Sequence, residues 1–239
     1  MIDYESLAGD YARHRRLHPG VLRALLAGGA VAAGSRVLEV GCGTGNYLGA
    51  MGRLAGCTAF GMDPAATMLS QAQVATACPG LCRGRAEALP FADAGLDLVF
   101  SVDVIHHVGD LAAYHREAAR LLRPGGRLCT VTDSEEIIRG RVPLSRYFPE
   151  TVAVELARYP RVEALLELMA AASLHDLRCD TVEATYAVTS SEPYRSRAYS
   201  SLVLIDDEAL RAGVARLDAD LARGAVMGVA RYVLLWGTR

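Results

Sequence analysis

The chain has 239 residues, 51% of them hydrophobic, and a formal net charge of -2 at pH 7. That length and apolar content allow a full buried core, and the weak charge argues against a nucleic-acid partner, which usually needs a basic face. The first residues are acidic rather than signal-like, and the longest apolar stretch, near 21–33, is interrupted by Arg23 and glycines. We therefore expect one soluble, cytoplasmic domain with no membrane span, and we leave its oligomeric state open.

Short apolar runs alternate with helical patterns through the first half of the chain. The alternation implies a parallel sheet covered by helices on both faces. Strands are predicted at about 36–40, 59–63, 81–84, 96–101 and 126–132, and helices at about 44–54, 65–76 and 110–122. Asp63-Pro64 marks one helix start, and Pro124-Gly125-Gly126 follows one helix end. After residue 133 the alternation is lost, and two late strands, 182–188 and 230–236, flank a helix near 206–222.

Three alternating glycines, Gly41, Gly43 and Gly45, directly follow the first predicted strand. Glycine has no Cβ, so the backbone of this loop can adopt positive φ and lie against a bound ligand. All 25 basic residues are arginine, which excludes a phosphate loop and lysine-based Schiff-base or pyridoxal-phosphate chemistry. A dinucleotide fingerprint would place a third glycine at position 46, where this chain has asparagine.

Asp63 ends the second predicted strand, 22 positions after Gly41. In a βαβ unit an acid at this place binds the two hydroxyls of a ribose, so Asp63 indicates a nucleoside ligand. A helix N-cap for the run that starts at Pro64 is the alternative, and the two roles can coexist.

The six cysteines show no metal-binding pattern. Cys78 and Cys82 are close in sequence, but neither has a clustered histidine or a second cysteine pair that would complete a tetrahedral zinc site. We expect buried thiols and no metal.

Five ordered segments together resemble the class I S-adenosylmethionine-dependent methyltransferases. The resemblance covers roughly residues 35 to 133, and its motifs are Glu39-Val-Gly-Cys-Gly-Thr-Gly45, Gly61-Met-Asp-Pro64, Gly84-Arg-Ala-Glu-Ala-Leu-Pro-Phe91, Leu96-Asp-Leu-Val-Phe-Ser101 and Leu121-Leu-Arg-Pro-Gly-Gly-Arg-Leu128. The chain looks most like the small-molecule branch with ubiquinone and menaquinone C-methyltransferases and natural-product tailoring enzymes. The resemblance implies a Rossmann-like, doubly wound, seven-stranded, mostly parallel sheet with an antiparallel edge hairpin and helices on both faces. It also implies S-adenosylmethionine as cofactor, S-adenosylhomocysteine as product, and in-line methyl transfer to a small-molecule acceptor.

The resemblance divides the single domain and assigns its cofactor residues. An N-terminal helical cap (1–34) precedes the cofactor-binding core (35–133), a candidate lid (134–158) and the C-terminal helices with the last two strands (159–239). The residues expected at the cofactor share positions with the family motifs or with the N-terminal helix: Tyr11, Arg15, Gly41, Gly43, Asp63, Pro64, Ala86, Glu87 and Ser101. Many relatives carry an acid at position 85 for the adenine amino group, and Arg85 cannot accept a hydrogen bond, so we expect Glu87 to take that part. The alternatives are a solvated loop acid for Glu87 and an amphipathic packing helix for Tyr11 and Arg15.

Two adjacent histidines, His106 and His107, follow the fourth predicted strand, where parallel α/β sheets bind their ligands. Imidazole titrates near neutral pH and can take a proton from an acceptor, so the pair supplies the candidate general base. We expect neighbouring side chains to diverge, with His106 favoured, unless both are structural. Asp133, after the fifth strand, is a further catalytic candidate that could orient a histidine, with a surface-loop role as the alternative.

Acceptor identity is the least determined property. The fourth predicted strand, which precedes His106 and His107, is not followed by the Pro-Pro-aromatic signature of amino-methylating DNA enzymes or by the Pro-Cys nucleophile of cytosine C5 enzymes. This favours a small-molecule acceptor over DNA. Arg146 and Tyr147 in the candidate lid and Tyr194 further on could contact a planar or anionic acceptor, or belong to a solvated face. The alternative functions are a cofactor-binding enzyme of the same fold with another reaction, a NAD-dependent oxidoreductase, and a non-catalytic partner subunit.

Overall fold

The structure is a computed structural model that describes residues 17–76 and 80–239. These residues form two compact units, each assembled from separate chain segments. The sheet unit comprises residues 17–132, Pro160–Val182 and Val233–Arg239, and the helical unit comprises Asp133–Tyr159 and Glu183–Tyr232. The expectation of a single domain stays a prediction.

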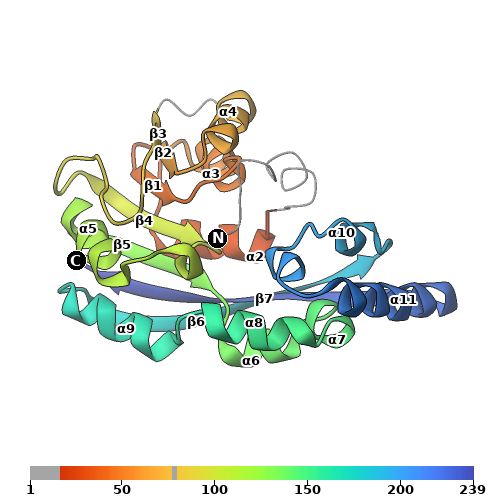
Figure 1. Cartoon of the computed structure of the whole chain (residues 1–239). Coiled ribbons are helices and arrows are strands. Elements are labelled where there is room, and N and C mark those ends of the chain that lie inside the picture. The colour runs from red at the N-terminus through yellow and green to blue at the C-terminus, as the bar shows by residue number, and fades with distance from the viewer. Residues whose placement is uncertain (1–16, 77–79) are drawn as a thin grey trace. The chain divides into compact units, whose positions relative to one another are not determined.

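The sheet unit alternates strands and helices in the order expected from the apolar periodicity (Figure 1). Its first elements run in chain order as α2 (Pro19–Gly28), β1 (Arg36–Val40), α3 (Asn46–Ala55), β2 (Thr58–Asp63), α4 (Ala66–Ala75) and β3 (Gly80–Arg83). They are followed by β4 (Leu96–Val102), the short 3₁₀ helix η1 (Ile105–His107), α5 (Leu111–Leu121), β5 (Leu122–Thr132) and α9 (Val162–Ala171). Four of the five residues of β1 are buried, which agrees with its mostly apolar sequence.

The sheet has seven strands in the order β3-β2-β1-β4-β5-β7-β6, with β1 parallel to both β2 and β4 and β5 antiparallel to β7. The predicted mostly parallel sheet with an antiparallel pair at its edge is therefore confirmed. Right-handed crossovers place the helices on opposite faces once the strand order reverses. That reversal lies between β1 and β4, and in open α/β sheets the ligand binds at the carboxyl ends of the strands at such a point.

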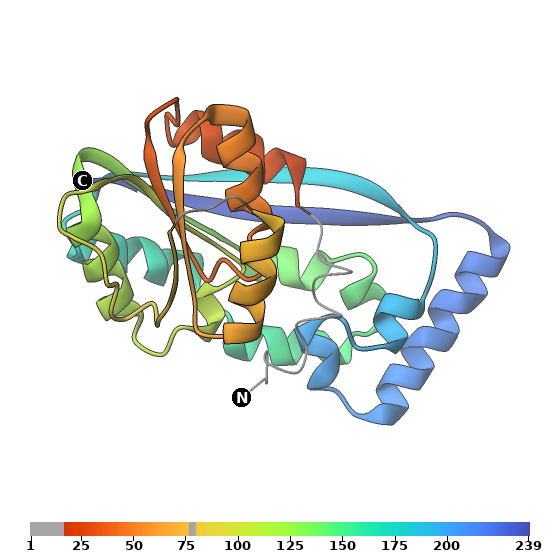
Figure 2. The ribbon, with the colours of Figure 1, turned by 90° about the horizontal axis from the view of Figure 1, so that it is seen from above.

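Two late strands are longer than predicted. The strands β6 (His175–Val188) and β7 (Val226–Thr238) lie beside each other and extend well beyond the expected ranges (Figure 2). Many side chains of β6 are exposed, so the apolar pattern used to predict strands is absent from its first half.

The strand β5 also starts earlier than predicted. The helix before it ends at Leu121 as expected, but the Pro-Gly-Gly segment belongs to the strand rather than to a loop. The pairing with β4 shifts register there, and Gly125, at φ 77°, donates its backbone N–H to the carbonyl of Arg239 at 2.7 Å. A bulge of this kind accommodates proline inside a strand.

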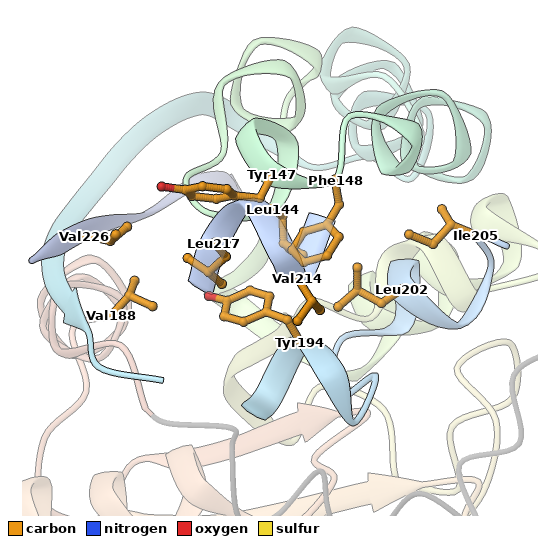
Figure 3. Packing of buried hydrophobic residues seen from close by; sticks show 10 residues of the cluster. All are labelled: Leu144, Tyr147, Phe148, Val188, Tyr194, Leu202, Ile205, Val214, Leu217 and Val226. Carbon is orange, nitrogen blue, oxygen red and sulfur yellow. The ribbon is translucent and has the colours of Figure 1, made fainter. Parts of the chain in front are cut away.

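The helical unit has a hydrophobic core of its own. Its helices are α6 (Glu135–Gly140), α7 (Leu144–Tyr147), α8 (Glu150–Arg158), α10 (Glu192–Arg195), the 3₁₀ helix η2 (Ser200–Val203) and α11 (Asp207–Arg223). Figure 3 shows the side chains of this core gathered between these helices and the adjoining strand residues: Leu144, Tyr147, Phe148, Val188, Tyr194, Leu202, Ile205, Val214, Leu217 and Val226. The rings of Phe148 and Tyr194 stack with centroids 5.6 Å apart. None of the helices in the described parts of the chain is long and apolar enough to cross a membrane.

Candidate cofactor and methyl-transfer site

The glycine loop between β1 and α3 needs glycine for its backbone conformation. Gly41, Gly43 and Gly45 have φ angles of 72°, 51° and 76°, a region that side-chain-bearing residues rarely adopt. Gly41 and Cys42 both donate their N–H groups to the carbonyl of Met62, at 2.7 and 2.9 Å. The loop is thus fixed to the end of β2.

The segment after β4 packs directly on this loop. A Cβ built on Gly41 would lie 2.4 Å from Cγ2 of Val104, two residues before His106. Such a distance leaves no space for a side chain at Gly41. The carboxyl ends of β1 and β4 therefore meet in one place, where the strand order reverses.

Asp63 ties the glycine loop to the start of α4. Its side chain is 8% exposed, and its two carboxylate oxygens accept the N–H groups of Gly43 and Ala65, each at 2.9 Å. Pro64 is exposed, and its carbonyl accepts from Nε of Arg83 at 2.8 Å. The predicted ribose and adenine contacts of Asp63 and Pro64 remain predictions.

The predicted adenine loop is fixed by Glu87. Oε1 of this side chain accepts the backbone N–H groups of Gly109 at 2.9 Å and Asp110 at 3.4 Å, and Oε2 lies 3.4 Å from Nε of Arg85. Burial raises the pKa of Glu87, but these N–H donors, its own N–H and Arg85 lower it, and the net pKa is below its ordinary value. Ala86 lies in the turn between them and is half-buried. Glu87 is thus an ionised, well-bonded acid rather than a solvated one.

The two histidines do not diverge as predicted. His106 is half-buried and His107 is exposed, yet their ring centroids are 4.0 Å apart with 49° between the ring planes. The expectation rested on strand or α-helix geometry, whereas both residues belong to the short 3₁₀ helix η1. The structure therefore presents the two imidazoles as one contiguous group at the carboxyl end of β4.

Ser101 is more deeply buried than a typical contact residue. It is 1% exposed and accepts a hydrogen bond from the Tyr114 hydroxyl at 3.2 Å. Burial raises the pKa of Tyr114 to about 12, so the tyrosine stays a neutral donor. Ser101 thus has a defined structural bond to α5, and its cofactor role stays a prediction.

Asp133 belongs to a buried charge network of the helical unit. Its Oδ2 is 3.2 Å from Nη1 of Arg141, whose Nη2 donates to Glu155 at 3.0 Å, and Arg158 lies 3.2 Å from the second oxygen of Glu155. Burial lowers the pKa of Arg141, but Asp133, Tyr159 and Glu155 raise it, so its net pKa is above the ordinary value. Two arginines and two carboxylates balance one another here. Asp133 is thus held in place by an arginine rather than lying in a surface loop.

The predicted acceptor residues lie in different surroundings. Tyr147 and Tyr194 are 3% and 2% exposed and belong to the core of the helical unit, where the Tyr147 hydroxyl donates to Asp220 at 2.7 Å. Arg146 has a 62% exposed side chain whose guanidinium lies 5.4 Å from the ring centroid of Tyr147. The two tyrosines therefore have packing roles, and acceptor contact by any of the three stays a prediction. Tyr11 and Arg15 lie outside the described residues.

Two residues with unusual features were not assigned a role from the sequence. Asp103, directly after β4, adopts a φ of 57°, which costs energy for a residue with a side chain and is typical of functional loops. Glu39 is 3% exposed within the apolar strand β1. A charged residue in an otherwise apolar buried strand is a signal that the sequence does carry. The sequence around Asp103, in contrast, does not indicate its positive φ angle.

These residues fit a nucleoside ligand with a cationic end. The glycine loop has the positive φ angles expected of a loop that lies against a ligand, Asp63 is an acid at the end of the neighbouring strand β2, and Oε2 of Glu39 is buried without a hydrogen-bond partner among the described residues. Within the same parts of the chain, no group of three or more histidine, cysteine, aspartate or glutamate side chains could hold a metal ion. The site thus matches the donor chemistry of S-adenosylmethionine, whose charge is positive.

Comparisons with known proteins agree with this geometry. A methyltransferase domain family matches residues 38–130. A ubiquinone biosynthesis O-methyltransferase of Brucella ovis is 30% identical over 175 residues, covering 69% of this chain and 68% of that protein. The methyltransferase GfsG of Streptomyces halstedii is 34% identical over 116 residues, 46% of this chain and 41% of that protein. The chain spans about half the length of the first curated relatives that it matches.

Solved structures show the same fold over nearly the whole chain. A crystal structure of a putative methyltransferase from an antibiotic biosynthesis pathway of Anabaena variabilis has a TM-score of 0.71 at 21% identity, and it covers 92% of this chain and 96% of its own. At that identity the likeness concerns the fold alone. Together with the extended match to the Brucella ovis relative, these findings show that the chain belongs to the S-adenosylmethionine-dependent methyltransferases.

Proposed function

We propose that this protein transfers a methyl group from S-adenosylmethionine to a small-molecule acceptor, with the His106–His107 pair taking the acceptor's proton. One observation carries the proposal. The histidine pair follows β4 at the reversal of strand order, and Val104, two residues earlier, packs on Gly41 of the glycine loop. This packing supports the proposal that the base and the cofactor loop belong to one site at the carboxyl ends of β1 and β4.

The cofactor supplies an electrophilic methyl group on a positively charged sulfur. Gly41 and Gly43 would lie along its methionine part, Asp63 would accept from the ribose hydroxyls, and Ala86 and Glu87 would lie at the adenine edge. Oε1 of Glu87 accepts from Gly109 and Asp110, and we assign the adenine contact to Oε2, which lies 3.4 Å from Nε of Arg85. Placing acceptor and donor in line contributes up to about 7–11 kcal/mol in favourable systems.

The acceptor atom must lose its proton as it gains the methyl group. Histidine takes protons near neutral pH, and a positioned base contributes about 10²–10⁴-fold to the rate. The adjacent rings, 4.0 Å apart, offer two imidazoles at one place. Because the Brucella ovis relative is named as an O-methyltransferase, we propose an acceptor hydroxyl.

The remaining acceptor contacts are proposed for the helical unit. Residues 134–158, which contain α6, α7 and α8, would form the acceptor side, with Asp133 held ready by Arg141. The exposed guanidinium of Arg146 would contact an anionic or planar group. Small net charge and the absence of nucleic-acid methyltransferase signatures support a small molecule, such as a natural-product intermediate.

The test replaces each histidine separately and together. The acceptor would first be found by measuring S-adenosylhomocysteine formation with a panel of hydroxylated aromatic compounds and quinols. We then expect His106→Ala or His107→Ala to lower kcat about 10²-fold or more, with cofactor affinity unchanged and the acidic limb of the pH-rate profile lost. His175→Ala is the matched control, because its side chain is 62% exposed and paired with Asp176 on β6.

Full turnover in both single variants and in the double variant, measured at saturating cofactor, would refute the role of the histidines as a base. The rate would then come only from the positioning of acceptor and donor. Product formation only with a protein or nucleic-acid acceptor would refute the small-molecule proposal.

A further inference from the structure

Glu39 is a buried carboxyl group that hydrogen bonds only partly satisfy. It lies near the end of β1, two residues before Gly41, and is 3% exposed. One interaction comes from the backbone N–H of Leu48 in α3. Its Oε2 has no hydrogen-bond partner among the residues that the structure describes. Carboxylates buried in this way are costly unless a charge or several donors compensate them.

The charge that acts on Glu39 belongs to a second acid, Asp63, and has the same sign as its own. Asp63, at the end of the neighbouring strand β2, is the second acid, and both its oxygens accept backbone N–H groups. Burial above all, and then Asp63, raise the pKa of Glu39 well above its ordinary value, while the N–H of Leu48 lowers it. Two acids therefore lie beside the glycine loop, one bonded through both oxygens and one short of donors.

Within the described parts of the chain, the other elements packed around β1 bring no compensating cation to Glu39. On β4 the titratable residue is Asp97, which accepts from the N–H of Arg36 and from Arg123. On α3 Tyr47 accepts the N–H of His18 through its hydroxyl, and the Arg53 guanidinium is placed near Gly49. The helix α4 has no titratable side chain. Among the described residues, the surroundings of Glu39 therefore favour its protonated form in the ligand-free protein.

We propose that Glu39 senses the charge of the cofactor: it releases its proton when the cationic methyl donor binds and regains one once the donor has become the neutral thioether. The inference rests on the cofactor of the family and not on the proposed acceptor or base. The donor carries a sulfonium charge that the product lacks, and a cation next to a buried acid favours the ionised form. Glu39 thereby becomes a residue that distinguishes donor from product.

The proton balance follows directly. Donor binding sends one proton from Glu39 to solvent, and the loss of the sulfonium charge on methyl transfer lets Glu39 take one back from solvent. Protons and donor therefore compete, so donor affinity falls as the pH falls through the titration of Glu39 in the free protein. Affinity for the neutral product does not show this pH dependence. The ratio of donor affinity to product affinity consequently rises as the pH rises through that titration.

Calorimetry of the whole protein tests this without any substitution. Binding of S-adenosylmethionine, S-adenosylhomocysteine and sinefungin would each be measured in two buffers of different ionisation enthalpy. Sinefungin carries an ammonium group in place of the sulfonium, so it reproduces the charge without the methyl donor. We expect about 0.5–1 proton released for each of the two cationic ligands and close to none for S-adenosylhomocysteine. Equal release for all three, or none for any, would overturn the inference.

A pair of variants assigns the proton to its residue. In Glu39→Gln we expect proton release to vanish and the ratio of donor to product affinity at pH 8 to fall about tenfold. Asp97→Asn, a carboxyl change in the same sheet away from the loop, should keep both properties of the wild type. If Glu39→Gln does not fold, the three-ligand comparison decides alone. Absence of binding by all three ligands would refute the cofactor assignment, whereas binding without the charge-dependent release would refute only the role of Glu39.

Discussion

The contact between Gly41 and Val104 can be tested by adding a single methyl group. Gly41→Ala forces a side chain onto a residue with φ 72°, which costs about 1–2 kcal/mol. The new Cβ would also lie 2.4 and 2.8 Å from the two Cγ atoms of Val104, and overpacking of this kind costs about 1–3 kcal/mol more. We therefore expect the free energy of unfolding to fall by about 2–5 kcal/mol in total.

Two further variants separate these contributions. Gly34→Ala is the control for backbone strain, because Gly34 has a φ of 87° and nothing within 4 Å of its added Cβ, so it should cost only about 1–2 kcal/mol. Val104→Ala combined with Gly41→Ala removes both Cγ atoms and leaves only the Val104 Cβ, at 3.1 Å. The double variant should recover about 1–3 kcal/mol relative to the sum of the single changes.

Urea unfolding of Gly41→Ala, Gly34→Ala, Val104→Ala and the double variant measures the free energies, and calorimetry with S-adenosylmethionine measures the effect on the loop. Additive single changes, with no coupling between Gly41 and Val104, would refute the packing of the η1 segment on the glycine loop. A cost for Gly41→Ala equal to that for Gly34→Ala would show that strain alone matters.

Two other predictions concern carboxylates of the same unit. Asp63→Asn keeps one acceptor oxygen but places an amide N–H group against a backbone N–H donor. The binding of S-adenosylmethionine should therefore weaken by about 1–3 kcal/mol. Unchanged affinity in calorimetry would mean that Asp63 only holds the loop in place. Glu87 has a pKa below its ordinary value, because its N–H donors and Arg85 outweigh the effect of burial, so its stabilisation is present at neutral pH and is lost as the pH falls through that lowered pKa. Thermal melts of wild type and Glu87→Gln from about pH 7 to 3 should therefore converge in acid, and a constant difference in Tm would contradict this assignment.

The strands and the cofactor loop could be predicted because their sequence signals are local. A buried parallel strand is a short apolar run, and Gly41, Gly43 and Gly45 all adopt the positive φ that their spacing indicates. The reversal of strand order between β1 and β4 then marks the edge of the sheet at which a ligand is expected. These features depend on backbone geometry, which residue type constrains strongly.

Other features depend on contacts that the sequence does not encode locally. The imidazoles of His106 and His107 lie side by side in a 3₁₀ helix of three residues, and no periodicity in so short a segment can indicate this. Tyr147 and Tyr194 pack in a core, and aromatic residues beside arginines look the same in a core as in a lid. The early start of β5 could not be predicted, because Pro-Gly-Gly usually ends a strand, whereas here a bulge accommodates it.

The bonds made by Glu87 limit how the protein can be redesigned. One carboxylate joins the loop expected at the adenine to Gly109 and Asp110, directly after the histidine segment and at the start of α5. Changing residues 84–91 to accept an altered cofactor would also release that attachment. Engineering of nucleoside selectivity should therefore preserve Glu87 and vary its neighbours, because the loss of this carboxylate would also free the segment that carries the two histidines.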